Sequence, residues 1–379
     1  MQDRRSIVIF RDWLLTASET FIRAQGEGLD GYVPFYVGLR RVAGLELPEK
    51  RSYVLSNGSF GGHLKEKIFK VTGYSPRLRR ELLSSAPCLI HAHFGFDGTT
   101  LLPIALHLPI PFLVTYHGFD ATLRREQLCQ TYWGRRYLRR LCKLKERCSL
   151  FVAVSQFIRK KLLAQGFPDD KICVHYIGID TRSFSPSPAV KRRPTVLFVG
   201  RLVEKKGCEY LIRAMQSVQE AAPQAELVVI GDGPLRPSLE KLATSTLRRV
   251  KFLGLQTQEQ IRDWMNQASV LSTPSVVAGS GDAEGFGMVF IEAQSMGLPV
   301  ASFASGGIPE AVTHGETGLL APERDWRALA ANILTLLTDK SAWQQMSDKA
   351  QERVRREFDL RKQCTKLEGI YDELLSKQA

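Results

Sequence analysis

Residues 195–234, TVLFVGRLVEKKGCEYLIRAMQSVQEAAPQAELVVIGDGP, contain a complete strand–helix–strand unit. A run of apolar, mostly β-branched residues opens the segment at 195–199, and a second such run follows at 226–230. A helix-length segment connects the two runs, and each run is followed directly by a glycine, Gly200 or Gly231. Two strands joined by a helix in this way are parallel neighbours in a sheet. The segment therefore predicts a parallel sheet covered by helices.

The same alternation extends through both halves of the chain. We expect strands, separated by helical segments, at residues 7–10, 32–37, 88–91, 112–116 and 150–154 in the first half and at 195–199, 226–230, 250–253, 269–271 and 299–302 in the second. Such alternation is typical of parallel sheets with helices on both faces. The predicted fold class is therefore α/β, with two doubly wound Rossmann-like domains.

A segment without a regular pattern separates the two halves. Residues 181–194, TRSFSPSPAVKRRP, contain three prolines and three serines, a composition that favours a hinge. We place the boundary near residue 186, which gives a first domain over residues 1–185 and a second over 186–357. The end of the chain is purely helical, and we expect its last helix, residues 358–379, to cross back and complete the first domain.

The charge of the chain is unevenly distributed. The 379 residues include 52 Lys and Arg against 39 Asp and Glu, which gives a formal net charge of +13. Residues 1–185 carry +12 of this charge and residues 186–379 only +1. A half so basic favours an anionic partner, which is nucleic acid, an acidic membrane surface or a phosphorylated substrate. Seven scattered cysteines and the lack of a signal-peptide pattern predict a cytoplasmic protein.

Two glycine-bounded loops follow strands of the second domain. Ligands of doubly wound sheets bind at the carboxyl ends of the strands, so these loops are candidate sites. In the first loop, Arg201 and Lys206 stand five residues apart and can converge on a diphosphate, one by paired hydrogen bonds and one as a point charge. A solvated turn is the alternative. The second loop, GDGP at 231–234, only partly resembles a phosphate-binding glycine loop and favours a turn.

The strongest local signal is residues 284–292, EGFGMVFIE. A helix is expected to begin in the middle of this segment, so the amide groups of residues 285–288 lie at its N-terminus, where free N–H groups and the helix dipole attract anions. Glu284 precedes the helix and Glu292 lies about two turns inside it. Two carboxylates so placed can accept hydrogen bonds from different sets of sugar hydroxyls. The alternative is an ordinary capped helix, which the glycines around Phe286 disfavour.

The segment 284–292 resembles the E-x7-E motif of the family 4 retaining glycosyltransferases, whose GT-B fold has two Rossmann-like domains facing a central cleft. Other motifs of that family occur here in the same order and spacing. They are the glycine-bounded loop at 200–207, IGDGP at 230–234, FLG at 252–254, SGGIPE at 305–310 and TGLL at 317–320. The resemblance spans essentially the whole second domain.

The resemblance implies roles for the matched residues around the donor. Arg201 and Lys206 would hold the nucleotide diphosphate and stabilise it as a leaving group. Glu292 would bind the ribose hydroxyls, and Glu284 would hold the donor sugar. The backbone amides that assist Glu284, and the residues near the base, complete the implied donor site, namely Gly285, Phe286 and Gly287 for the sugar and Gly231 and Phe252 for the base.

In the first domain the resemblance is narrower. The segment TYHGFD at 115–120 resembles the family's HGxD motif, which places His117 beside the donor sugar and among the catalytic residues. The segment SETFI at 18–22 resembles one found in bacterial exopolysaccharide enzymes of the colanic-acid and amylovoran type. We place Glu19, His93 and Asp120 on the acceptor side. The chain lacks the GG loop that many relatives carry near the N-terminus, so the contacts made there are unassigned.

Two further features of the first domain have competing interpretations. His91 and His93 share one face of a strand, which would suit a metal. The lack of a third ligand at suitable spacing favours a structural pair, so we predict no metal and no cofactor beyond the substrate. Residues 132–147, YWGRRYLRRLCKLKER, predict a basic amphipathic helix. Its apolar stripe lies either on an anionic membrane surface or in the protein core.

These observations together predict a metal-independent retaining hexosyltransferase. It would move a sugar from a nucleotide-sugar to a polyprenyl-diphosphate-linked oligosaccharide in bacterial exopolysaccharide biosynthesis, at the cytoplasmic face of the inner membrane. Gln256, Thr257 and Gln258 follow the FLG turn where some guanine-using relatives carry an acidic side chain, which favours UDP. The alternatives are a small soluble acceptor, a nucleic-acid-binding module, which no recognition motif supports, and a noncatalytic scaffold, which the complete donor motif set disfavours.

Overall fold

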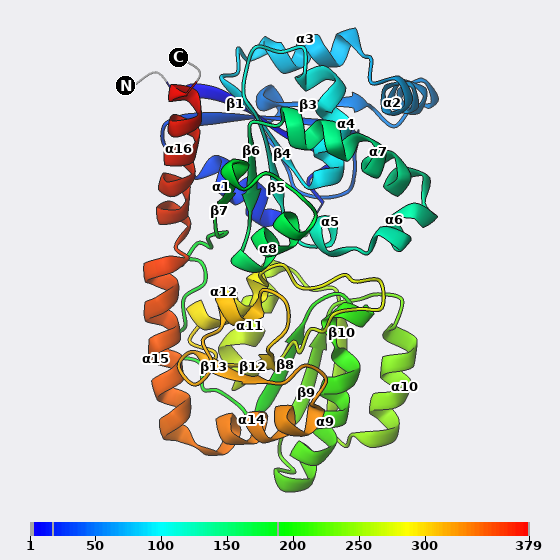
Figure 1. Cartoon of the computed structure of the whole chain (residues 1–379). Coiled ribbons are helices and arrows are strands. Elements are labelled where there is room, and N and C mark those ends of the chain that lie inside the picture. Colours follow the sequence, from blue (N-terminus) through cyan, green and yellow to red (C-terminus); the bar gives the residue numbers. More distant parts are fainter. Residues whose placement is uncertain (1–3, 17–18, 188, 378–379) are drawn as a thin grey trace. The chain divides into compact units, whose positions relative to one another are not determined.

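The chain folds into two compact units (Figure 1). The computed structural model describes residues 4–16, 19–187 and 189–377. The first unit combines Met1–Gly178 with Leu360–Ala379, and the second is Ile179–Asp359. The chain therefore passes from one unit to the other twice.

The observed boundaries differ from the predicted ones near residues 186 and 358. Ile179 already belongs to the second unit, because its amide donates to the carbonyl of Phe358 at 2.9 Å. The two crossing points of the chain are thus joined by a backbone hydrogen bond within the second unit, and local composition does not reveal such a pairing. Within the predicted hinge, the described residues form no helix or strand.

The first unit is built on a parallel sheet with the strand order β3-β2-β1-β4-β5-β6-β7. Its strands are β1 (Arg5–Leu14), β2 (Tyr32–Arg41), β3 (Ser52–Ser56), β4 (Leu89–His93), β5 (Phe112–Tyr116), β6 (Leu150–Ala153) and β7 (Ile172–Val174). Its helices are α1 (Thr20–Glu27), α2 (Phe60–Thr72), α3 (Pro76–Ser84), α4 (Gly95–Ala105), α5 (Phe119–Thr122), α6 (Arg125–Gln130), α7 (Tyr132–Arg147), α8 (Gln156–Ala164) and α16 (Leu360–Ser376). The order grows outward on both sides of β1, which is the predicted doubly wound arrangement.

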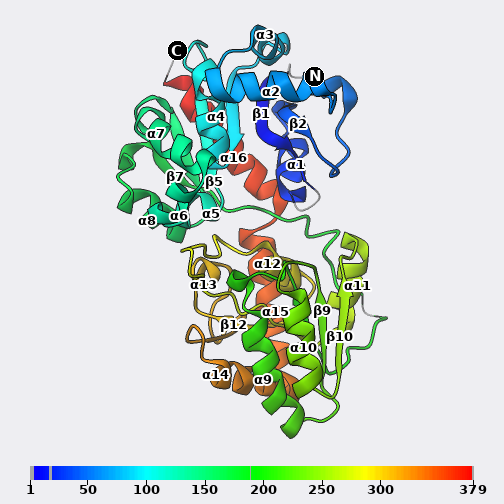
Figure 2. The ribbon, with the colours of Figure 1, turned by 90° about the vertical axis from the view of Figure 1, so that its right-hand side faces the viewer.

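The central strands of this sheet are buried and largely apolar because helices cover both faces (Figure 2). Every residue of β5 is buried, and Ile7 and Ile9 of β1 lie in the core. Leu367 and Tyr371 of α16 pack into the same core. The C-terminal helix therefore completes the first unit, as predicted.

The second unit has a parallel sheet with the order β10-β9-β8-β11-β12-β13. Its strands are β8 (Thr195–Val199), β9 (Glu226–Ile230), β10 (Val250–Gly254), β11 (Val270–Leu271), β12 (Val300–Phe303) and β13 (Gly318–Ala321). Its helices are α9 (Cys208–Ala221), α10 (Arg236–Thr246), α11 (Gln258–Gln267), α12 (Met288–Ser295), α13 (Ile308–Ala311), α14 (Trp326–Thr338) and α15 (Lys340–Glu357). The prediction of two doubly wound α/β units is confirmed.

The basic helix α7 settles one of the alternatives left open by the sequence. Tyr137, Leu141 and Leu144, three of its apolar residues, are buried in the first unit. Only Tyr132 and Trp133, at its first turn, remain about half exposed. Of the two alternatives for this stripe, the core interpretation therefore holds for Tyr137, Leu141 and Leu144.

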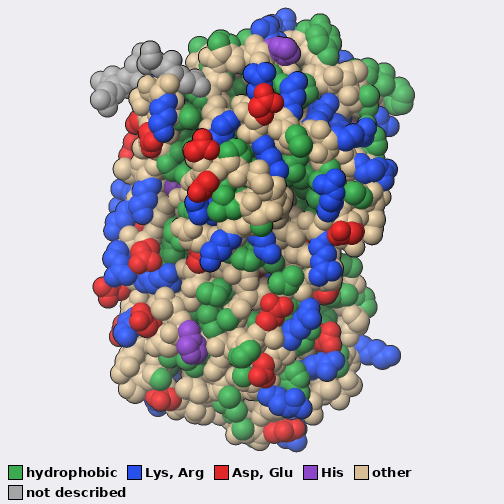
Figure 3. All heavy atoms as spheres, in the orientation of Figure 1, with side chains coloured by type: hydrophobic (Ala, Val, Ile, Leu, Met, Phe, Trp, Pro, Cys, Tyr) green, Lys and Arg blue, Asp and Glu red, His purple; other side chains and the backbone are tan. Residues whose placement is uncertain are grey.

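The difference in net charge between the two parts of the chain is larger for the observed units than for the predicted domains. The first unit contains 31 Lys and Arg against 18 Asp and Glu, and the second contains 21 of each. The whole net charge of +13 thus belongs to the first unit. Blue cationic side chains are correspondingly frequent over the upper part of the molecule in Figure 3. Among the described residues, no helix is both long and apolar enough to span a membrane.

Candidate active site

Arg201 and Lys206 lie in the loop between β8 and α9, where two backbones come unusually close. Gly207 ends this loop with φ +64°, and a Cβ atom there would lie 1.9 Å from the carbonyl oxygen of Pro274. Gly231, after β9, has φ +133°, and its Cβ would lie 2.0 Å from the oxygen of Gly200. Only glycine tolerates both the contact and the left-handed backbone. The two loops predicted from glycine spacing are therefore packed backbone to backbone.

Lys206 is paired with Glu284 across these loops. Its Nζ lies 2.5 Å from Oε2 of Glu284, and the two side chains are 18% and 13% exposed. Lys205 pairs with Asp282 at 3.0 Å beside them. Burial raises the pKa of Glu284, but the charges of Lys206 and Lys205 and the hydrogen bond outweigh it, so the pKa lies below its ordinary value. Glu284 is therefore ionised near neutral pH and holds Lys206 in place.

The backbone around Glu284 is held by the loop after β12. Gly307 N donates to the carbonyl of Glu284 at 2.9 Å, and a Cβ on Gly307 would lie 2.1 Å from the oxygen of Gly285. Gly306 has φ +59°, and a Cβ added there would lie 2.4 Å from the Glu284 oxygen. Gly287 has φ +90° and precedes α12 directly. The SGG segment thus sets the position of the loop that carries Glu284.

Glu292 lies on α12 with its charge linked to Lys206. Burial raises its pKa to about 7, against the opposing positive charge of Lys206. The structure therefore brings Lys206, Glu284 and Glu292 into one electrostatic group, with one cation and two carboxylates whose pKa values are displaced in opposite directions. Displacements of this kind are typical of functional sites.

The other residues predicted around the donor are arranged differently. The Arg201 side chain is exposed and has no ion-pair partner among the residues that the structure describes. Phe252, in β10, packs against the core of the unit. Phe286 is buried and packs edge-on against Phe358, with ring centres 5.3 Å apart. The Phe286 side chain therefore anchors the loop, while Arg201 is the side chain available to a ligand.

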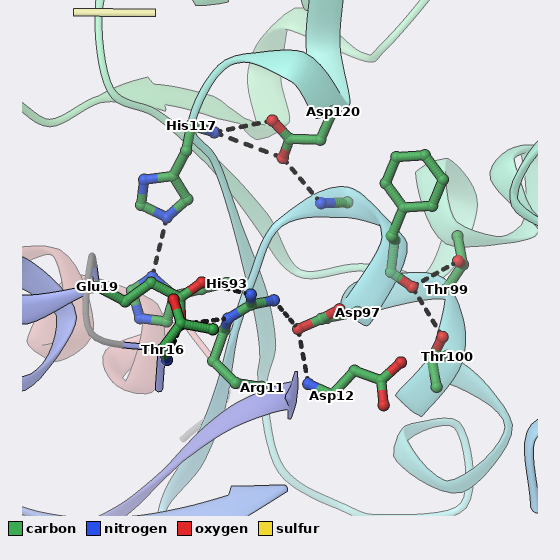
Figure 4. Close-up of polar contacts among 12 residues, drawn as sticks. Arg11, Asp12, Thr16, Glu19, His93, Asp97, Thr99, Thr100, His117 and Asp120 are labelled. Atoms are coloured by element: carbon green, nitrogen blue, oxygen red, sulfur yellow. Dashed lines mark hydrogen bonds and ion pairs between the residues drawn. The ribbon is translucent and has the colours of Figure 1, made fainter. Parts of the chain in front are cut away.

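In the first unit, two histidines from neighbouring strand ends meet. His93 ends β4, and its Nδ1 lies 3.0 Å from Nε2 of His117, just after β5 (Figure 4). Burial is the largest cause that lowers the pKa of both imidazoles well below the ordinary value, so both are neutral near pH 7. His117 Nδ1 is buried and has no hydrogen-bond partner among the described residues. An unsatisfied ring nitrogen of this kind is suited to a ligand hydroxyl.

Asp120 holds the loop that carries His117. Its Oδ1 accepts from the amides of Gly118 at 2.9 Å and His117 at 3.1 Å, and its Oδ2 accepts from Gly95 at 3.0 Å. Burial raises the pKa of Asp120 to about 6 against these hydrogen bonds. The prediction placed Asp120 on the acceptor side, but its carboxylate is turned inward onto the backbone and positions the loops after β4 and β5.

Glu19 is likewise engaged inside the unit. Its Oε1 accepts from Arg11 Nη2 at 2.5 Å, and its Oε2 accepts from the Thr16 amide at 3.0 Å. Arg11 also pairs with Asp97, as Figure 4 shows. Ser18, which precedes Glu19 in the SETFI segment, lies outside the described residues. Glu19 therefore fixes Arg11 rather than presenting a free carboxylate to an acceptor.

Sequence reasoning missed Arg11 and Asp97. The guanidinium of Arg11 lies 4.4 Å from the ring centre of Phe94, and the Phe94 ring lies 4.5 Å from that of His117. Phe94 has φ +70°, which is rare for a residue with a side chain. Arg11 follows the apolar run of β1, and inspecting every strand end would have found it. Its partner Asp97 is 86 residues away, a distance that no local pattern bridges.

His91 completes the group and favours the structural interpretation. Its Nδ1 lies 2.6 Å from the hydroxyl of Tyr371, and its Nε2 lies 2.6 Å from Oγ1 of Thr115. Burial lowers its pKa to about 3. Both ring nitrogens are occupied, so His91 connects β4 to the C-terminal helix and His93 connects β4 to His117.

Two family models match the chain. The model described as Glycosyl transferases group 1 matches residues 180–353, and the model described as Glycosyltransferase Family 4 matches residues 39–183. Both units of the structure are therefore matched, each by its own model.

Several curated proteins with similar sequences carry names of bacterial polysaccharide or glycolipid biosynthesis. The amylovoran biosynthesis glycosyltransferase AmsK of Erwinia amylovora is 34% identical over 64% of this chain and 60% of its own length. The putative colanic acid biosynthesis glycosyltransferase WcaL of Escherichia coli is 31% identical over 71% of this chain and 66% of its own length. A GDP-mannose-dependent phosphatidylinositol monomannoside mannosyltransferase of Mycobacterium tuberculosis is 34% identical over 49% of this chain and 52% of its own. The chain spans less than two thirds of the length of these relatives.

Solved structures resemble the whole chain. HepE from Anabaena, in complex with UDP and glucose, has a TM-score of 0.78 at 21% identity and covers 98% of this chain and 100% of its own. Sucrose-phosphate synthase from Thermosynechococcus elongatus has a TM-score of 0.75 at 22% identity, with coverages of 99% and 100%. At these identities the likeness shows the fold alone, and that fold is GT-B, as predicted.

Proposed function

We propose the following reaction for this chain, which belongs to the glycosyltransferases of group 1 and family 4. It transfers a hexosyl unit from a nucleotide-sugar to a hydroxyl group of a lipid-linked oligosaccharide, and the product keeps the anomeric configuration of the donor. The names of the amylovoran and colanic acid relatives support a place in exopolysaccharide assembly.

One observation carries the proposal, namely the group formed by Lys206, Glu284 and Glu292 around the start of α12. Departure of a nucleoside diphosphate places negative charge on a phosphate oxygen. A half-buried lysine stabilises that charge more strongly than a solvated cation does, because the local dielectric is lower. In this assignment Lys206 neutralises the leaving group, Glu284 binds sugar hydroxyls, and Glu292 binds the ribose.

Arg201 supplies the second positive charge. Its exposed side chain lies in the same loop as Lys206 and has no ion-pair partner among the described residues that would compete with a ligand. A guanidinium binds phosphate oxygens through two parallel hydrogen bonds. The two cations of one loop therefore suit the two phosphates of one diphosphate, and the proposal needs no metal ion. We expect transfer to persist in the presence of EDTA.

We assign front-side attack to the transfer step. The bond between the anomeric carbon and the phosphate oxygen breaks, a bond from the same carbon to the acceptor oxygen forms, and the acceptor proton passes to the departing phosphate. Glu284, the ionised carboxylate of the group, is already bound by Lys206, which disfavours it as a nucleophile. The anomeric configuration of the product, measured by NMR, tests retention. A trapped covalent glycosyl-enzyme would overturn front-side attack.

UDP is the favoured donor nucleotide, because no acidic side chain occurs among the three residues 256–258 that follow the FLG turn. The experiment is a thermal shift of the full chain against UDP-, GDP- and ADP-sugars. A ligand at a hundred times its dissociation constant stabilises the folded state by about 2.7 kcal/mol. A shift with GDP-sugars alone would overturn the UDP assignment, and the lack of a shift with every nucleotide-sugar would overturn the function.

The acceptor is assigned to the first unit. His93, predicted on the acceptor side, lies against Nε2 of His117, which the resemblance implies lies beside the donor sugar. The Nδ1 of His117 is buried without a partner among the described residues, which supports binding of a substrate hydroxyl there. A polyprenyl-diphosphate acceptor would bring the enzyme to the cytoplasmic face of the inner membrane. Transfer to extracted lipid-linked oligosaccharides, compared with transfer to soluble sugars, tests this part. Equal use of both would favour the soluble acceptor.

A further inference from the structure

Helix α2 buries two charged side chains, Glu66 and Lys70, and exposes most of its large apolar ones. Glu66 is 2% exposed and accepts from Arg40 Nε at 3.0 Å and from Lys70 Nζ at 2.9 Å. Lys70 also pairs with Asp12 at 2.7 Å. Phe69 is the one large apolar side chain on this inward face of the helix. Ion pairs therefore hold the inward face, which leaves the remaining apolar residues of α2 for the outward face.

The outward face of α2 is an apolar stripe. Phe60, Leu64, Ile68 and Val71 follow one another at intervals of four, four and three residues, so they lie on one side of the helix. Phe60 is 88% exposed, Val71 is 62% exposed, and the other two are about half exposed. Tyr74, just beyond the helix, is also largely exposed. Contiguous exposed apolar patches mark interaction sites. Green side chains lie at the corresponding upper right edge in Figure 3.

The surroundings of the stripe are cationic. The exposed charged side chains of α2 and α3 are all basic, namely Lys65, Lys67, Arg77, Arg79 and Arg80. The acidic residues of the same stretch are Glu66, which is buried and paired, and Glu81, which is half-buried. No exposed carboxylate of α2 or α3 therefore balances these charges.

A hollow of about 950 Å³ lies beside the end of the stripe. Tyr74, Arg79 and Arg80 line it together with apolar side chains such as Leu83 and Ile104. Figures 1 and 2 both place α2 and α3 at the same end of the first unit. We call the stripe, Tyr74 and the arginines of α3 the α2–α3 surface.

We propose that the α2–α3 surface docks the protein on an anionic lipid bilayer. The four apolar side chains enter the boundary between headgroups and acyl chains, and the flanking lysines and arginines bind lipid phosphates. An apolar stripe bordered by cations is the pattern of helices that lie in a membrane interface. The proposal deepens the lipid-linked acceptor of the proposed function and replaces α7 with α2 as the membrane-facing helix.

Charge and size favour a bilayer over a protein partner. The net +13 of the first unit complements the negative surface of a membrane rich in anionic lipids. A stable protein–protein interface takes about 20 to 30 residues on each side. The α2–α3 surface offers one stripe and one hollow, which is enough for a shallow, reversible insertion.

The experiment measures binding of the full chain to vesicles of phosphatidylcholine with and without phosphatidylglycerol, by flotation. Each cation near an anionic surface contributes about fivefold to binding, so R79Q/R80Q should weaken binding roughly 25-fold. L64Q/I68Q should weaken it at least about tenfold, because both side chains lose apolar contact with the lipid. K241Q/R248Q removes two exposed cations from the second unit and serves as the charge-matched control, with binding unchanged.

Three results with vesicles would overturn the proposal. They are no binding of the unmodified chain to anionic vesicles, equal binding to vesicles without phosphatidylglycerol, and equal loss in the control variant. An α2-dependent dimer in sedimentation, without vesicle binding, would also overturn it in favour of a second copy of the chain. The thermal shift with nucleotide-sugars should be unchanged in every variant. Failure of that shift in the unmodified chain speaks against the proposed reaction and not against docking.

Discussion

Substitution of Lys206 tests the proposed reaction most directly. Removing one preorganised cation from a closed site costs on the order of 3 kcal/mol, or about a hundredfold in rate. We expect Lys206→Met to lose about this much kcat, and Glu284→Gln to lose most transfer as well, without unfolding. Because the two side chains are paired at 2.5 Å, the double variant should lose less than the sum of both effects. Near-normal turnover in either purified single variant would refute the site assignment.

Glu292 gives the site a measurable pH dependence. Burial raises its pKa to about 7 in the folded chain, against an unfolded value near 4.5. Between these values the folded state keeps a proton that the unfolded state has lost, so this residue lowers stability as pH rises through that window. Between pH 4 and pH 8, the free energy of unfolding of the wild-type chain should fall by up to about 3 kcal/mol relative to that of the Glu292→Gln variant. Urea unfolding of both proteins at several pH values measures this difference, and parallel curves would contradict it.

At the scale of single elements, the loop between β8 and α9 depends on Gly207. An added Cβ meets the Pro274 oxygen at 1.9 Å, and the φ of +64° is strained for any other residue. Gly315 is a matched control, because it has φ +77° and nothing within 4 Å of an added Cβ. We expect Gly315→Ala to cost about 1 kcal/mol of stability with an unchanged donor KM. Gly207→Ala should cost more and should raise the donor KM, because the loop carrying Lys206 must move. Steady-state kinetics with urea unfolding separates the two effects.

Some of the helices and strands could be predicted from the sequence and others could not. The central strands were predicted because burial on both faces makes them largely apolar. The strands β3, β7 and β13 were missed because they lie at sheet edges, where a half-buried or very short run such as Ile172–Val174 resembles a loop. The buried ion pairs and the exposed apolar stripe of α2 could not be predicted from the sequence, for another reason. Its inward face is stabilised by Arg40 and Asp12, whose distance from α2 along the chain hides the pairing.

The same limit applies to the candidate site. Motif spacing identified Lys206, Glu284 and Glu292, since their loops follow a family pattern, and the structure groups them. It did not reveal that Glu19 and Asp120 are occupied by Arg11 and by backbone amides, respectively. A side chain's partners depend on tertiary contacts, so sequence can select a carboxylate without showing whether it faces a ligand or the protein.

At the scale of the whole molecule, the first unit depends on the last helix of the chain. Cys364, Leu367, Tyr371 and Leu374 of α16 lie in its core, and the Tyr371 hydroxyl lies 2.6 Å from His91. A chain ending at residue 359 would expose that core and leave the His91 nitrogen unsatisfied. Each large core side chain contributes about 2 to 5 kcal/mol to the free energy of unfolding. Loss of all those of α16 together therefore exceeds the stability of most domains. We expect the first unit of the truncated chain to unfold while the second remains folded.

Limited proteolysis of the truncated chain distinguishes a local from a global dependence on α16. Cleavage should remove residues 1–178 and leave a resistant fragment that begins near residue 179, because the second unit has its own core. That fragment should still give a thermal shift with nucleotide-sugars, since Arg201, Lys206, Glu284 and Glu292 all lie within it. A synthetic peptide of residues 360–377, added in trans, should restore protection of the first unit. Resistance of the first unit without the peptide would show that α16 only covers a core that is stable by itself.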